Sequence, residues 1–395
     1  MKTKIFGIAL LMLTAVAVLY YPALNAESRD PGNSAERHDV AQRPVVDVVF
    51  VLDTTGSMSG LIQTAKDKIW SIASTMASAQ PTPEIRIGLV GYRDRGDEYV
   101  TRIVDLDADL DSVYAALMDF QAGGGGDTPE SVNAALADAV NNMSWSQRDQ
   151  AYQVIFLVGD APPHMDYNET RYPEIVATAR EKGIVINTIQ CGELPSTIDP
   201  WTTIASLGGG NFFQVEQSGG AVAYETPYDA EIATLSARLD KTRLYYGSAD
   251  ELQKAEQKMA AAEDIAASAS VASRARRGVF NAAEGGRENL LGDQELVAAV
   301  VNGEVTLEEL DKDELPDVLK PMAPAAQERH VEELAEERAD LQTRIRQLAD
   351  ERSEYIAEKV EAAGGHEDSL DKRLYDTVRE QAGKAGLEYE SGPAY

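Results

Sequence analysis

The stretch Val-Val-Phe-Val-Leu-Asp-Thr-Thr-Gly-Ser-Met, from Val48 to Met58, decides the fold of this chain. Its apolar run is typical of a central strand that is covered on both faces, and the run ends abruptly at Asp53. Thr55 and Ser57 follow at the predicted turn into a helix. One carboxylate and two hydroxyls in such a cluster suit a hard divalent cation, Mg²⁺ before Ca²⁺. The same residue types also cap helices, so this stretch alone leaves capping and metal binding open.

Strands and helices alternate outward from this stretch, over residues 45–247. The patterns predict further strands at 84–92, 99–106, 153–158, 184–189 and 211–215, and helices at 58–79, 109–121, 129–143, 172–182 and 231–245. The link between the strands 84–92 and 99–106 is too short for a parallel crossover, so these two form a hairpin. We therefore expect an α/β domain with a doubly wound, mostly parallel, Rossmann-like sheet, whose ligands bind at the carboxyl ends of the strands.

Two later segments bring more oxygen atoms to the same edge of the sheet. Thr128 follows a loop of four glycines, and we expect it at the N-cap of the next helix with its hydroxyl facing the strand ends; Asp127 is the alternative at this position. Asp160 ends the strand at 153–158. Adjacent parallel strands would place Asp53 and Asp160 side by side. This convergence favours a metal site over simple capping.

The pattern Asp53-x-Thr55-x-Ser57, followed by Thr128 and then Asp160, resembles the metal-ion-dependent adhesion site of von Willebrand factor type A domains. The resemblance implies that Thr55, Ser57 and Thr128 ligate Mg²⁺, with Ca²⁺ and Mn²⁺ as alternatives, while Asp53 and Asp160 act through hydroxyls and waters. Many members of the family have Ser where Thr55 stands, and both supply a hydroxyl.

The resemblance also implies a function for the whole chain. It is similar to exported bacterial proteins of this family, so we expect a protein-binding module for adhesion or complex assembly, in which an acidic residue of a protein partner completes the metal shell. A structural envelope scaffold built on the C-terminal helices is the alternative. A metal-dependent hydrolase with Asp53 as nucleophile is disfavoured, because Thr55 occupies the position where such enzymes need a second acid. We expect no enzymatic activity and no small-molecule cofactor.

The N-terminus has the pattern of an export signal. Lys2 and Lys4 precede an apolar run and small residues, which predicts a signal peptide at 1–26, cut near Ala26, and then a disordered linker at 27–44. The protein is then periplasmic or secreted; an uncleaved membrane anchor is the alternative. The formal net charge of −30 excludes nucleic acid as a partner, because its binding needs a basic surface.

The second half of the chain has a different composition. We expect a mainly α-helical C-terminal region: an acidic helical segment at 248–326, a coiled coil or helical hairpin at 327–362, and a last helix and tail at 363–395. A coiled coil would allow a homo-oligomer.

The single cysteine, Cys191, is expected to be a small buried side chain. His164 and the charged run from Arg93 to Arg95 are expected to lie on the surface.

Overall fold

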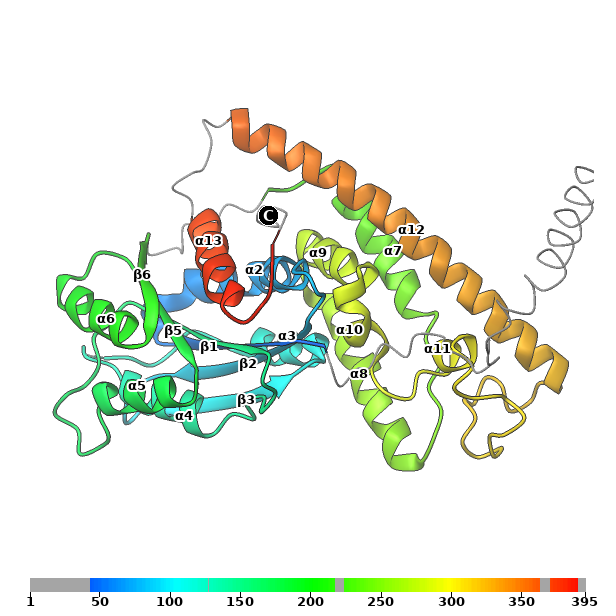
Figure 1. Cartoon of the computed structure of the whole chain (residues 1–395), viewed down its shortest axis with the longest axis horizontal. Helices are drawn as coiled ribbons and strands as arrows, with labels where there is room; N and C mark the ends of the chain where they lie inside the picture. The colour runs from blue at the N-terminus through cyan, green and yellow to red at the C-terminus, as the bar shows by residue number, and fades with distance from the viewer. Residues whose placement is uncertain (1–42, 127, 217–223, 363–369, 390–395) are drawn as a thin grey trace, which may run out of the picture. The chain divides into compact units, whose positions relative to one another are not determined.

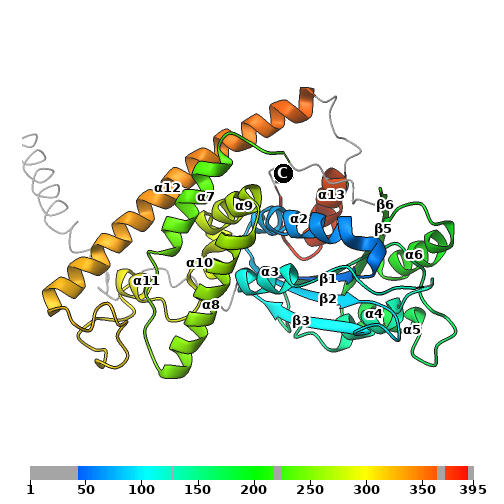
Figure 2. The ribbon, with the colours of Figure 1, turned by 180° about the vertical axis from the view of Figure 1, so that it is seen from behind.

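A six-stranded sheet forms the centre of the first half of the chain (Figure 1). The structure is a computed structural model that describes residues 43–126, 128–216, 224–362 and 370–389. The strand order is β3-β2-β1-β4-β5-β6, with β3 at one edge (Figure 2). The strands are β1 (Val45–Asp53), β2 (Glu84–Tyr92), β3 (Thr101–Asp107), β4 (Ala151–Gly159), β5 (Val185–Cys191) and β6 (Gly209–Val215).

The pairing of the strands confirms the predicted doubly wound fold. β2 and β3 are antiparallel, and all other neighbouring strands are parallel. β1 lies between β2 and β4, so the winding of the chain reverses beside β1. Ligand sites in such sheets lie outside the strand ends at this reversal point, which is where β1 ends in Asp53.

Helices cover both faces of the sheet because its strands are apolar on both sides. One face packs against α2 (Ser59–Ala77) and α3 (Leu110–Met118), and the other against α4 (Val132–Asn141), α5 (Tyr172–Glu181) and α6 (Pro195–Leu207). A short 3₁₀ turn, η2 (Gly56–Met58), joins β1 to α2. Helix α6 was not predicted, because Pro200 lies inside it and interrupts the pattern.

The last helix that covers the sheet comes from the C-terminus of the chain. We expected a helix at 231–245 to close this domain, but α7 (Asp229–Asp240) packs instead against α9 (Val271–Ala282) and α12 (Pro324–Ala362). Helix α13 (Leu370–Gly383) places Tyr375, Val378 and Ala382 in the core beside α2. The chain then pairs Gln80 with Glu388 through two backbone hydrogen bonds of 2.8 and 2.9 Å.

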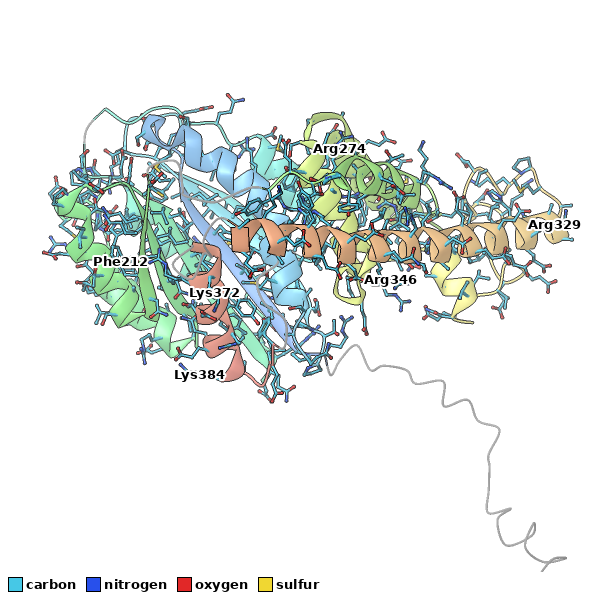
Figure 3. All side chains as sticks on the ribbon, turned by 90° about the horizontal axis from the view of Figure 1, so that it is seen from above. Phe212, Arg274, Arg329, Arg346, Lys372 and Lys384 are labelled. Atoms are coloured by element: carbon cyan, nitrogen blue, oxygen red, sulfur yellow. The ribbon has the colours of Figure 1, made fainter. Side chains whose placement is uncertain are left out.

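The intervening segment forms a helical region with two small apolar clusters of its own. It contains α7, α8 (Ala249–Ser268), α9 (Val271–Ala282), η3 (Glu284–Gly286), α10 (Arg287–Leu291), α11 (Leu296–Val301) and α12 (Pro324–Ala362). Helix α12 is one continuous helix and not a hairpin. Its buried side chains, which include Leu341, Ile345 and Leu348, pack against α7 and α9 within the chain, while charged residues such as Arg329 and Arg346 project outward (Figure 3). The heptad pattern therefore describes an internal face.

A buried ion cluster joins the helical region to α3. The Arg277 guanidinium on α9 contacts Asp111 on α3 at 2.5 Å and Asp240 on α7 at 2.7 Å. Burial alone would raise the pKa of Asp111, but Arg277 holds that pKa below its ordinary value of 3.8. Arg277 and Asp111 are almost fully buried, while Asp240 is 14% exposed, so removal of Arg277 or Asp111 leaves an uncompensated buried charge.

The predicted signal peptide at 1–26 and nearly all of the predicted linker at 27–44 lie outside the described residues. Among the helices in the part of the chain that the structure describes, none has the length and apolar character needed to cross a membrane.

The attachment of α13 to the sheet can be tested at Gln381. Its side chain accepts a hydrogen bond from the Tyr152 hydroxyl at 2.7 Å and exchanges two with the Asn187 amide. Gln381→Leu should lower the free energy of unfolding by about 2 kcal/mol, because both partners lose a buried hydrogen bond. Urea denaturation measures the change. Glu380→Gln, on the exposed side of the same helix, should change stability by less than about 0.5 kcal/mol; equal effects would contradict the packing of α13.

The Arg277 cluster should make stability depend on pH in a defined direction. Because the pKa of Asp111 is lower in the folded state, its contribution is complete above pH 3.8 and is lost as the pH falls through the folded-state pKa. Asp111→Asn should destabilise the protein by about 3 kcal/mol at pH 7, and by less below pH 4. Urea titrations at the two pH values test this expectation. A stability loss independent of pH would contradict it, and Asp119→Asn on the exposed end of α3 is the control.

Candidate metal centre

The carboxyl ends of β1 and β4 bring the two predicted aspartates to one place. The strands pair in parallel up to Leu52 and Val158, so Asp53 and Asp160 follow the last paired residues on neighbouring strands. Gly159 permits the close approach, because a Cβ there would overlap the Tyr92 hydroxyl and lie 2.9 Å from the Asp53 Cβ. The predicted adjacency of the two aspartates is therefore present in the structure.

The turn after β1 directs the hydroxyls of Thr55 and Ser57 to the same side. The Thr55 backbone NH and hydroxyl both donate to Asp53 Oδ1, at 2.8 and 2.6 Å. The Thr55 and Ser57 hydroxyl oxygens lie 3.3 Å apart. Thr55 is buried and Ser57 is exposed, so one of the two hydroxyl-bearing residues lies in the protein interior and the other at the surface. These hydrogen bonds fix the direction of the Asp53 carboxylate.

The glycine-rich loop lies directly over this turn. The Gly56 NH donates to the Gly124 carbonyl at 3.2 Å, and Gly124 and Gly125 adopt left-handed φ values of 70° and 69°. A Cβ on Gly125 would lie 3.1 Å from the Thr55 Cβ, and one on Gly124 would overlap the Asp97 carboxylate. Asp97 in turn accepts a hydrogen bond from the Gly125 NH at 3.0 Å. Larger residues would push the loop away from Thr55.

Thr128 follows the glycine loop but does not cap α4, so that prediction was wrong. The N-cap of α4 is Ser131. Glu130 cannot begin the helix, because its NH donates to the Pro162 carbonyl and its own carbonyl accepts from the His164 NH, which joins it to the loop after β4. The exposed Thr128 side chain still lines the same pocket as Thr55, Ser57 and Asp160. The alternative residue Asp127 lies outside the described residues.

Together these segments surround an open pocket of about 400 Å³ at the end of the sheet. Its lining residues are Thr55, Gly56, Ser57, Gly124, Gly125, Gly126, Thr128, Glu130, Asp160, Ala161, Cys191 and Leu194. Cys191 is buried, as predicted, and free of any disulfide. Asp53 lies beneath Thr55. Four of the five predicted metal-site residues thus line one pocket, and the fifth is hydrogen-bonded to one of them.

Two carboxyl groups at the pocket, those of Asp53 and Glu130, have raised pKa values because burial and neighbouring negative charges destabilise their ionised forms. Burial raises the pKa of Asp53 to about 7, against the hydrogen bonds from Thr55, and the Asp160 charge adds to the rise. Burial and the nearby charges of Asp53, Asp94, Asp97 and Asp160 raise the pKa of Glu130 to about 8. A bound cation would reverse these shifts, because it stabilises each carboxylate in its ionised form.

The donor set fits a hard divalent cation. Asp53 Oδ2 is fully buried and has no hydrogen-bond partner among the described residues. Carboxylate and hydroxyl oxygens are the ligands that Mg²⁺ and Ca²⁺ prefer. Within the same residues, no group of three or more His, Cys, Asp or Glu side chains could hold a metal ion on its own. A cation at this pocket would therefore depend on the hydroxyls of Thr55, Ser57 and Thr128.

Three polar or charged residues that we expected on the surface are buried. Asp94 accepts hydrogen bonds from the Ser131 hydroxyl at 2.8 Å and from the Tyr167 hydroxyl at 2.9 Å. The His164 ring stacks on Tyr167 and lies 3.3 Å from Asp94. Arg93 is also buried, and donates to the Thr54 and Gln121 carbonyls. The partners of Asp94 and Arg93 named above come from distant segments, so no local pattern could have predicted the burial of these two residues.

Comparisons with known proteins find a family model and two relatives that are similar to parts of this chain. The family model described as von Willebrand factor A domain matches residues 47–217. An ariadne-like RING finger protein of Acanthamoeba polyphaga mimivirus is 29% identical over 127 residues, which cover 31% of this chain and 12% of that protein. The alpha-protein kinase vwkA of Dictyostelium discoideum is 29% identical over 121 residues, which cover 30% of this chain and 19% of that protein. The chain thus matches less than a fifth of the length of either relative.

Among solved structures, the chain is similar to proximal thread matrix protein 1 of the mussel byssus with a zinc-occupied metal-ion-dependent adhesion site. That similarity has a TM-score of 0.33 at 18% identity, and covers 44% of this chain and 42% of the other. Domains of the matched family generally act as protein-interaction modules. On the sheet order, the site geometry and the family match, residues 47–217 of this chain are a von Willebrand factor A domain.

Proposed function

We propose that this chain is a binding protein whose A domain recognises a protein partner through a divalent cation, Mg²⁺ first, with Ca²⁺ and Mn²⁺ as alternatives. The observation that carries the proposal is the convergence of Thr55, Ser57, Thr128 and Asp160 on one open pocket, with the buried Asp53 carboxylate beneath. Thr55, Ser57 and Thr128 would hold the ion, and Asp53 and Asp160 would act through hydroxyls and waters.

The cation, when bound, would supply an electrophilic coordination position that an Asp or Glu side chain of the partner can fill. The residues around the cation would orient its ligands and keep the pocket open. Asp53 orients the Thr55 hydroxyl through the 2.6 Å hydrogen bond, and the glycine loop leaves the pocket open to an incoming side chain. A chain with a formal charge of −30 repels acidic partners, so the local positive charge would direct them to this position.

The geometry disfavours the hydrolase alternative. Asp53 is fully buried beneath Thr55, and its Oδ1 accepts two hydrogen bonds from that residue, so it is held away from any substrate in the pocket. We therefore propose a non-enzymatic role.

The heptad pattern of α12 was the basis for expecting a homo-oligomer. Because the heptad face of that helix packs against α7 and α9 within the chain, it no longer supports one.

The metal site can be tested with two neighbouring threonines. Thr55→Val keeps the side-chain shape but removes the hydroxyl at the pocket, and should weaken Mg²⁺ and Mn²⁺ binding at least about tenfold. Asp53→Ala should abolish binding. The matched control is Thr54→Val, since the Thr54 hydroxyl donates to the Tyr92 carbonyl at 2.8 Å and does not line the pocket. Isothermal titration calorimetry measures the affinities.

The same variants test whether binding of the partner depends on the metal. Capture of a partner from envelope or medium fractions should occur in Mg²⁺, with wild type and Thr54→Val as baits, and should be lost in EDTA or with Thr55→Val. Capture that is unchanged in EDTA would overturn the proposal of metal-dependent binding.

We also propose that the protein is exported, on the basis of the N-terminal signal pattern. Expression in a bacterial host should yield a mature periplasmic or secreted form that begins near Glu27, as measured by intact-mass spectrometry. Leu11→Arg should retain the full-length chain inside the cell, because a charge interrupts the apolar run. A full-length chain in the membrane fraction would instead support the uncleaved anchor.

A further inference from the structure

Glu130 has a buried carboxylate that lines the proposed metal pocket. None of the roles described above is assigned to this side chain. It is 3% exposed, and its Oε2 atom has no hydrogen-bond partner among the described residues. Burial of an unpaired carboxylate costs several kcal/mol, about as much as a small domain can tolerate at one position. Such a group calls for a positive partner that protein atoms do not supply here.

The backbone of Glu130 fixes where its side chain lies. Its NH donates to the Pro162 carbonyl at 2.9 Å, and its carbonyl accepts from the His164 NH at 3.0 Å. These bonds hold it between the glycine loop and the loop that follows β4. A Cβ built on Gly125 would lie 3.4 Å from Glu130 Oε1 and 3.1 Å from the Thr55 Cβ. The carboxylate is therefore a close neighbour of Thr55 on the pocket side of the glycine loop.

Three buried polar side-chain atoms in this part of the molecule have no hydrogen-bond partner within the residues that the structure describes. They are Asp53 Oδ2, the Tyr92 hydroxyl and Glu130 Oε2. The first two lie together against Gly159, where a Cβ would be 3.2 Å from Asp53 Oδ2 and would overlap the Tyr92 hydroxyl. Unpaired buried atoms of this kind are rare in folded proteins, and a bound ion is one explanation for them.

We propose that Glu130 is a sixth side chain of the metal centre, whose carboxylate faces the bound cation. This inference rests on the proposed metal-dependent function and deepens it. Glu130 then adds one carboxylate to a centre that otherwise depends on the hydroxyls of Thr55, Ser57 and Thr128. Glu130 strengthens the binding of the cation, and it also competes with the acidic residue of the partner for the positive charge of the ion.

The test compares two Glu→Gln variants of the full chain, with Mn²⁺ and Mg²⁺ alone as probes. Glu130→Gln should weaken both metals about 10- to 100-fold in titration calorimetry. In EDTA, the same variant should melt at a higher temperature than wild type, because it removes a carboxyl group whose ionised form is destabilised by burial. Glu98→Gln removes an equal charge from a nearby but 80% exposed side chain, and should change metal affinity less than about threefold.

The two readouts separate a metal role from a structural one. A Glu130→Gln variant with wild-type affinity, or with the same small change as Glu98→Gln, would overturn the inference. So would a variant that melts at a lower temperature in EDTA, since that result identifies Glu130 as a structural group. If wild type binds neither metal, the proposed function itself fails. If Thr55→Val loses the metal and Glu130→Gln retains it, the inference about Glu130 alone is wrong.

Discussion

The burial of the Asp53 carboxylate constrains the conformation of the turn after β1 and of the glycine loop beside it. The side chain has no exposed surface, and only one of its two oxygens is hydrogen-bonded within the described residues. To keep a charge there, the chain must turn at once so that Thr55 can donate twice to it. The glycine loop must then approach Thr55 more closely than any side chain would allow. A divalent cation would make this arrangement favourable, because it replaces the water that the carboxylate lost.

The sequence predicted the parts of the fold that depend on local pattern. The apolar runs of β1 and β4 identified central strands, and the short link after β2 required a hairpin with β3. Parallel pairing then placed Asp53 beside Asp160. Helix α6 was missed because prolines and polar residues interrupt its apolar spacing. The placement of Asp53 and Asp160 at one edge of the sheet followed from strand ends, which a local pattern can identify.

The positions that could not be predicted depend on contacts between distant segments. Glu130 is buried because its backbone pairs with the loop at 162–164, and the N-cap of α4 shifts to Ser131 for the same reason. Asp94 and His164 are charged or polar residues in loops, which usually indicates exposure. They are buried because Ser131 and Tyr167 supply hydrogen bonds and a stacking surface. A linear pattern cannot carry this information, since each partner is at least 35 residues from Asp94.

The helical region takes part in positioning the pocket at the end of the sheet, although it follows the matched domain in sequence. Trp70 on α2, the helix that follows Ser57, packs against Phe280 of α9 with ring centres 5.9 Å apart. Lys66 on the same helix donates to the Phe120 carbonyl, just before the glycine loop. Arg277 holds the helix that leads into this loop through Asp111. Both segments that enter the pocket from this face are therefore anchored on the helical region, while α13 closes the sheet beside them. The helical region after β6 therefore packs on the elements that surround the pocket and supports them.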